Sequence, residues 1–372
     1  MLTITAGGFL GLLISTFFIG FANGSVEAAC NPLGADLYKD DKTKWLNRFH
    51  VWFPGGSVSG AGVSYIMTNA GIGWQPQIAV MLIPTAIYGY MVFTTKFPDV
   101  PEIEKVVDLD AKGLLLMTAI FGLLVLIGTP NELVAGLPGT FILPLLLVLG
   151  LTFLLMLFRA GRTRDAALLI VLMGIMSVTA TSEHGTQQWV DRILGAQLGG
   201  IPGQAMIVLG IVTGIMAVGR YFAGPLLHAL NPLGVLLLRA VLTTLGLFLM
   251  SSASGAMVYV SAIVFAIGVC YFWPTMIGVT AQYVPRSGAL GMSLVGAAGM
   301  FALTIWNPII GGWIDSARAA AEASGLTGDA VEVAAGQGAL SQLVYFPVAL
   351  IVVFAALFMA RNWIRETSGS VS

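Results

Sequence analysis

The sequence predicts an all-α, polytopic membrane protein, and three observations support this class. The 372-residue chain is 57% hydrophobic and only 9% charged, with a mean hydropathy of +0.90. Soluble domains carry about 25% charged residues, so in water this chain would expose far too much apolar surface. Its apolar runs are continuous and do not alternate, which excludes a transmembrane barrel. The net charge of -1 argues against a nucleic-acid partner.

About eleven stretches are apolar enough for a transmembrane helix, which needs about 20 residues. They centre on residues 8–34, 49–68, 76–95, 112–128, 139–158, 165–182, 203–223, 233–251, 257–281, 289–313 and 341–361. Residues 316–340 fit either an ordered outer helix or a flexible loop. The two cysteines, Cys30 and Cys270, lack metal-ligand or disulfide spacing, so we expect neither a metal site nor a disulfide.

The positive charges predict the direction of the chain, because Lys and Arg accumulate in short cytoplasmic loops. If the loop of residues 35–48 is cytoplasmic, all but two of the 17 Lys and Arg residues fall on that side. The two exceptions are Arg192 and Arg318. We therefore expect the N-terminus of this chain outside and its C-terminus in the cytoplasm.

The first apolar stretch contains polar residues at a depth that the bilayer disfavours. Asn23, Glu27 and Asn31 are spaced by four and form a stripe on one helical face. A charge at the centre of a membrane helix costs roughly 2.5–3.5 kcal/mol on insertion scales, and such a residue by default indicates function. A carboxyl group that gains and loses a proton suits proton coupling. The alternative is a protonated Glu27 that hydrogen-bonds to a neighbouring helix for packing.

Later stretches carry further candidate substrate-binding side chains. Aromatic rings beside hydrogen-bonding groups suit sugars, although rings at a membrane interface give the same pattern. His50 also fits a structural role, and Glu183 also fits an exposed carboxylate at a helix end. Pro274 breaks a helix near mid-membrane, as in transporters and in simple packing kinks. The candidates are Asn23, Asn31, His50, Trp52, Glu183, Gln187, Tyr271, Trp273 and Asn307.

Several segments resemble the major facilitator superfamily. They are GFANGSVEAACNPL, LNRFHVWFPGG, CYFWPTMIGV and GRYFAGPLLHALNP. The chain is similar to the branch of fucose permease-like sugar:proton symporters and their bacterial relatives, over most of residues 10–95 and 165–315. The resemblance implies a major facilitator-type helical bundle in a bacterial inner (plasma) membrane. It also implies that the first helix here is the family's fourth, so that the N-terminal half is incomplete.

The same resemblance implies three units. They are a partial N-terminal bundle of three helices (1–98), a cytoplasmic linker with two extra transmembrane helices (99–164), and a C-terminal six-helix bundle (165–372). The two halves are expected to rock about a site near mid-membrane during transport.

The resemblance also assigns individual residues. Glu27 falls on the family's membrane glutamate of proton coupling and substrate binding, and Arg220 falls in a cytoplasmic gating motif. His50 and Phe53 stand where the fucose branch has Gln and Asn. The identity of the sugar therefore stays open.

These inferences predict a secondary active transporter of a small polar solute, a sugar by resemblance, moved by proton symport with alternating access. We expect a non-enzymatic monomer without cofactors, whose partners are the solute, protons and the lipid bilayer. Two alternatives stay open: a non-transporting remnant or sensor of the same fold, and an intramembrane enzyme acting on lipids. The enzyme needs clustered acid–base residues, whereas we expect His50 and His184 at opposite faces of the membrane.

Overall fold

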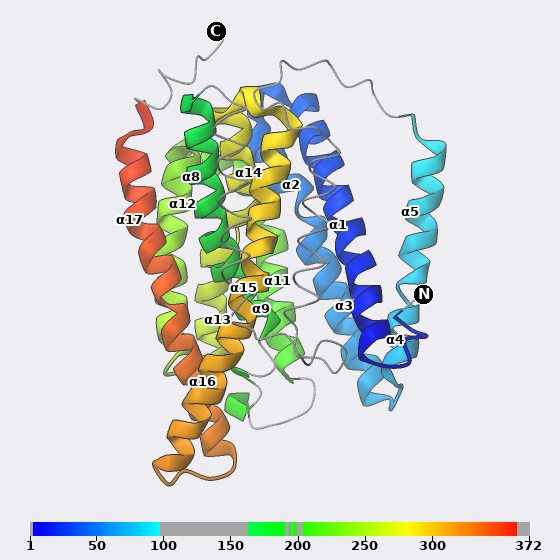
Figure 1. Ribbon diagram of the computed structural model, residues 1–372, viewed down its shortest axis with the longest axis vertical. Helices are drawn as coiled ribbons and strands as arrows, with labels where there is room; N and C mark the ends of the chain where they lie inside the picture. Colours follow the sequence, from blue (N-terminus) through cyan, green and yellow to red (C-terminus); the bar gives the residue numbers. More distant parts are fainter. Residues whose placement is uncertain (1–2, 97–162, 190–192, 195, 199–203, 363–372) are drawn as a thin grey trace, which may run out of the picture.

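The computed structural model describes residues 3–96, 163–189, 193–194, 196–198 and 204–362, and these ranges are built from helices joined by turns (Figure 1). A helix satisfies its backbone N–H and C=O groups internally, as a bilayer requires. Six described helical stretches are long and apolar enough to cross a membrane. They are Trp74–Thr94, Ala167–Gln188, Ala223–Met250, Ala256–Tyr283, Pro285–Ala323 and Asp329–Met359. The chain is an all-α integral membrane protein.

The N-terminal part contributes a small group of helices that joins the rest of the bundle through α1, α2 and α3. Its elements are α1 (Phe9–Leu37), the 3-10 turn η1 (Lys39–Asp41), α2 (Lys42–Phe49), α3 (Trp52–Asn69), α4 (Trp74–Ala79) and α5 (Leu82–Thr94). Helix α1 packs on α15, α2 on α14 and α3 on α11. Helix α5 is exposed along almost its whole length and lies apart from the bundle (Figure 1).

The C-terminal part contains most of the buried core. Its elements are α8 (Thr163–Ala180), the π-helical turn η3 (Thr181–Gly185), α9 (Thr186–Gln188), the 3-10 turn η4 (Ala196–Leu198), α11 (Gln204–Tyr221), α12 (Ala223–Met250), α13 (Ala256–Val269), α14 (Phe272–Tyr283), the 3-10 turn η5 (Pro285–Ser287), α15 (Gly288–Ala323), α16 (Asp329–Leu343) and α17 (Tyr345–Met359). Helix α8 packs on α15, and α12 packs on both α13 and α17.

Prolines explain two of the breaks in these helices. Pro274 lies in the first turn of α14 and has no N–H to donate to the carbonyl of Cys270, four residues earlier, so the helical path is interrupted at Tyr271. Pro232 disfavours a helical conformation at the residue before it. Asn231 adopts φ 56° and ψ 165°, which interrupts α12 close to its start.

Glycines allow α12 and α13 to approach closely. A Cβ atom added at Gly246 would lie 2.5 Å from the backbone of Phe265, and one added at Gly268 would lie 2.5 Å from the backbone nitrogen of Thr243. Close backbone contact of this kind is how membrane helices gain packing energy. By contrast, no described atom lies within 4 Å of a Cβ added at Gly20 in α1.

Figure 1 orients the bundle. The C-terminal ends of α1, α14 and α17 lie at one end, and the turn between α15 and α16 lies at the opposite end. The distribution of Lys and Arg in the sequence predicts that the end formed by α1, α14 and α17 is cytoplasmic. Residues 316–340 are mostly helical, within α15 and α16. The expected helices at 112–128 and 139–158, and most of the expected linker 99–164, lie outside the described residues.

Candidate functional site

A small cavity lies where the N-terminal helices meet the C-terminal part. It has a volume of about 10 Å³, which is roughly the space that one water molecule needs. Six of its lining residues carry ionisable or amide side chains. The lining residues are Asn23, Glu27, His50, Phe53, Glu183, His184, Arg220, Trp273 and Met300. We call this the central cavity.

Glu27 and His50 form the first pair in the central cavity. The Glu27 side chain is 27% exposed, and its Oε2 lies 3.5 Å from the Nε2 of His50. The Nδ2 of Asn31, one helical turn after Glu27, donates to the same Oε2 at 2.6 Å. The sequence stripe therefore brings Glu27 and Asn31 into contact, and a break between α2 and α3 brings His50 opposite them.

The hydrogen bonds of His50 fix how this pair holds a proton. Its Nδ1 lies 2.8 Å from the carbonyl oxygen of Leu46, which only accepts, so Nδ1 carries the hydrogen. In a neutral imidazole, Nε2 then presents a lone pair to the Glu27 carboxylate, and two acceptors would face each other. The pair is favourable only when one further proton lies on Nε2 or on Glu27.

Arg220 forms the second buried group. It is only 1% exposed and its donors reach three separate elements. Its Nη2 donates to Oε1 of Glu183 at 2.8 Å, its Nη1 to the carbonyl of His50 at 3.1 Å, and its Nε to the carbonyl of Cys270 at 2.7 Å. Arg220 thus ties η3, the α2–α3 junction and the α13–α14 break together.

Glu183 lies in the π-helical turn η3 and is fully buried. Single π-helical turns within α-helices occur frequently at functional sites. Its Oε2 has no hydrogen-bond partner among the described residues. His184 follows it, 4.0 Å from Glu183 Oε1, and packs edge-on against Phe53 and Trp273 at 5.9 and 5.6 Å between ring centroids.

The structure differs from the sequence expectations for Arg220, His50 and His184, and it decides between the two positions left open for Glu183. Arg220 is in the last turn of α11 and buried, not in a cytoplasmic loop, because the helical path continues into α12 as far as the Asn231 break. Glu183 is not exposed at a helix end, because the buried Arg220 pairs with it. His50 and His184 do not lie at opposite faces but line the same cavity.

The other predicted residues have separate positions. Trp52 is 80% exposed and does not line the central cavity, because the α2–α3 break turns it outward. Tyr271 donates its hydroxyl to the carbonyl of Gly219 at 2.6 Å. Gln187 contacts the sulfur of Met216 at 3.3 Å. Asn307 donates to Gln188 at 2.6 Å and therefore belongs to a different hydrogen-bonded group.

Sequence reasoning left out three lining residues, Phe53, His184 and Met300, as site residues. The ionisable imidazole of His184 next to Glu183 was a usable signal, whereas Phe53 and Met300 have ordinary membrane-helix character. Sequence reasoning also gave no role to Arg239, which is 8% exposed, with its guanidinium carbon 4.4 Å from the centre of the Tyr271 ring. Among the described residues, no three His, Cys, Asp or Glu side chains are arranged to hold a metal ion.

Comparison of the chain with models of known protein families and with curated proteins finds no match. The fold and the site define an α-helical integral membrane protein with a largely buried cluster of two carboxyl groups, two imidazoles and a guanidinium.

Proposed function

We propose that the protein is a secondary active transporter that moves a small polar solute, a sugar, together with protons. The observation that supports this most directly is the Glu27–His50 pair in the central cavity. Ionisable groups within membrane helices mark proton relays and substrate pathways. We further propose a major facilitator-type bundle of about eleven helices in a bacterial inner membrane, with the N-terminus of this chain outside.

Protonation would bias two arrangements of the helices through this pair. With one shared proton, a charged His50 attracts a charged Glu27 across the junction between α1 and α2. A second proton neutralises the carboxylate and ends that attraction, while His50 stays tied to Leu46. A ligand, here a proton, shifts an equilibrium by its differential affinity for the two states.

The solute would bind among the side chains of the central cavity. Asn23, Glu27 and His184 offer hydrogen-bonding atoms, and the Trp273 ring offers an apolar face. A cavity of about 10 Å³ is too small for a sugar, so the described conformation corresponds to a closed state. The halves must separate before a solute enters, as alternating access requires.

Uptake by the purified chain in proteoliposomes tests this function. With an alkaline lumen, radiolabelled D-glucose, D-galactose and L-fucose would be offered singly, with and without a protonophore. We expect protonophore-sensitive accumulation of at least one sugar, and its loss in Glu27→Gln while exchange down a sugar gradient persists. The matched control is Glu322→Gln, which removes an exposed carboxylate near the α15–α16 turn. Accumulation by Glu27→Gln at the wild-type rate would contradict the proton-carrying role.

A further inference from the structure

A row of side chains crosses the junction between the N-terminal and C-terminal parts at the predicted cytoplasmic end. Tyr38, directly after α1, stacks on Trp45 of α2 with 3.9 Å between the ring centroids. The guanidinium carbon of Arg48 lies 5.0 Å from the centre of the Trp45 ring and 5.4 Å from the centre of the Tyr221 ring at the end of α11. We call these four residues the Arg48 stack.

The guanidinium of Arg48 uses only part of its hydrogen-bonding capacity. Arginine presents a fork of N–H donors, and among the described residues Arg48 makes one hydrogen bond, from Nε to the carbonyl oxygen of Tyr221 at 3.3 Å. Its two terminal nitrogens have no acceptor in the part of the chain that the structure describes. They keep accessible surface, because Arg48 is only half-buried. The rings therefore hold the cation in place while its terminal N–H groups stay open to a ligand.

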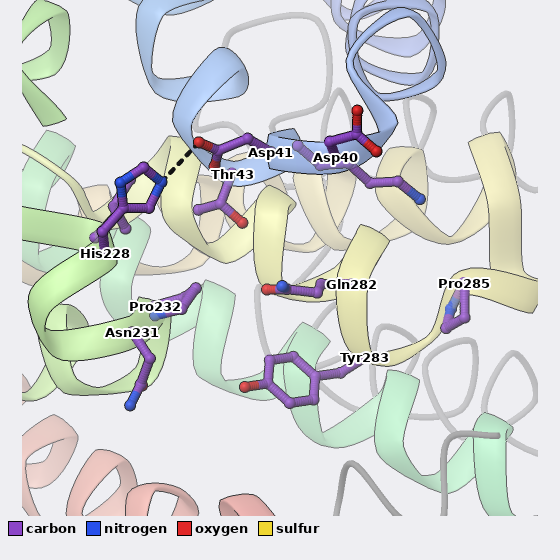
Figure 2. Close-up of a pocket in the computed structure, with 11 residues that line it drawn as sticks. Asp40, Asp41, Thr43, His228, Asn231, Pro232, Gln282, Tyr283 and Pro285 are labelled. Atoms are coloured by element: carbon purple, nitrogen blue, oxygen red, sulfur yellow. Dashed lines mark hydrogen bonds and ion pairs between the residues drawn. The ribbon is translucent and has the colours of Figure 1, made fainter. Parts of the chain in front are cut away.

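No described carboxylate neutralises Arg48, since none lies within 4.0 Å of its nitrogens. Asp41, at the end of η1, is engaged elsewhere. Its Oδ2 lies 2.8 Å from Nε2 of His228, as Figure 2 shows, and 3.4 Å from Nζ of Lys44. Residues 36–49 contain four Lys and Arg and three Asp, which leaves one positive charge. A single monoanionic group at Arg48 would balance this segment.

The side chains around the Arg48 stack indicate that it lies at the membrane interface. Tyr38, Phe49, Tyr221 and Phe222 are all exposed. Aromatic residues gather where a helical bundle meets the lipid headgroups. The cytoplasmic leaflet carries anionic phospholipids, and the arginine fork matches the geometry of phosphate oxygens. The charge, the aromatic surroundings and the predicted side of the membrane therefore favour the same ligand.

We propose that the Arg48 stack binds the phosphate of an anionic phospholipid in the cytoplasmic leaflet. The terminal N–H groups of Arg48 donate to the phosphate oxygens, while Trp45 and Tyr221 hold the guanidinium. A zwitterionic headgroup carries its own cation and therefore offers no net countercharge. Because Arg48 belongs to α2 and Tyr221 to α11, the bound headgroup joins the two parts of the protein.

Protection of arginine from chemical modification tests the site in the unaltered chain. The purified full chain, in a neutral detergent, would react with phenylglyoxal, and peptide mass spectrometry would follow the modification of Arg48. We expect phosphatidylglycerol to slow this modification about twofold at half-occupancy. Phosphatidylcholine and inorganic phosphate, at the same concentrations, should leave it unchanged. The internal control is Arg286, an exposed cation in η5 at the same end of the bundle.

Native mass spectrometry of variants assigns the contact to the Arg48 stack. Arg48→Gln should weaken binding of the first phosphatidylglycerol about tenfold, through the loss of a charge-assisted contact. Arg286→Gln should leave this binding unchanged. Tyr221→Leu keeps the charge but removes one of the rings that hold the guanidinium, so it should weaken binding by a smaller factor. If Arg48→Gln does not fold, the modification of the unaltered chain decides alone.

Several results would overturn the proposal. They are no protection of Arg48 by phosphatidylglycerol, equal protection by phosphatidylcholine, or equal protection of Arg286. Equal protection by inorganic phosphate would show a site for a free anion and not for a lipid. Binding of phosphatidylglycerol by Arg48→Gln with the wild-type affinity would also contradict it. None of these measurements involves uptake, so their outcome is independent of the transport function proposed above.

Discussion

Loss of the buried Arg220 guanidinium should destabilise the bundle strongly. Arg220→Gln leaves the fully buried Glu183 without its cation and removes the donors to the carbonyls of His50 and Cys270. Removing one partner of a buried ion pair costs about 3–5 kcal/mol, because the other charge stays desolvated. We expect a loss of that size in the free energy of unfolding near neutral pH.

A double-mutant cycle isolates the pair from the rest of the network. In Glu183→Gln/Arg220→Gln the uncompensated charge is absent, so the double variant should be more stable than the sum of the single losses by about 1–3 kcal/mol. Unfolding by SDS in mixed micelles, followed by tryptophan fluorescence, measures each corner of the cycle. Arg286→Gln, at an exposed position, is the matched control. A loss below about 1 kcal/mol for Arg220→Gln, or additive losses, would refute the reasoning.

Three further outcomes are expected. Gly268→Val should lower the free energy of unfolding by at least about 1–3 kcal/mol in the same SDS titration, through overpacking against Thr243. Gly20→Val should lower it little, because no described atom lies within 4 Å of the added Cβ. Equal losses would contradict the close packing of α12 and α13. Arg318→Ala removes bonds to Asp315 and Glu332. These partly exposed pairs are worth under about 1 kcal/mol, so the readout is faster proteolysis at residues 324–328, and unchanged proteolysis would speak against it. His50→Gln should abolish the pH dependence of sugar uptake while exchange persists; an unchanged pH profile would remove His50 from the proton pathway.

The fold class was predictable because membrane insertion depends on length and apolar character, which are properties of local sequence. The helices expected around residues 165–182, 289–313 and 341–361 are present in α8, α15 and α17. The number of spans is not set by the described residues, and the assignment to the major facilitator superfamily stays a prediction. The path of α11 into α12 was missed, because the sequence analysis ended one apolar stretch at residue 223 and began the next at residue 233.

The site was predictable only along single helices. The four-residue spacing that joins Glu27 to Asn31 is visible in the sequence and is formed in α1. The Arg220–Glu183 pair is not visible, because it joins residues 37 positions apart whose depths depend on a π-helical turn and on how far α11 continues. The prediction that Trp52 lines the site failed for a related reason. The helix breaks just before Trp52, so the side chains of α3 point in directions that a continuous helix would not give.

His50 takes part in two separate interactions. Its imidazole faces the proton-holding carboxyl of Glu27, while its own carbonyl oxygen accepts from Arg220. Any swivel at the junction of α2 and α3 that carries the ring away from Glu27 must also strain the Arg220 contact. An intermediate conformation of this junction would lose both interactions at once. The protein should therefore populate two discrete conformations and few intermediate ones.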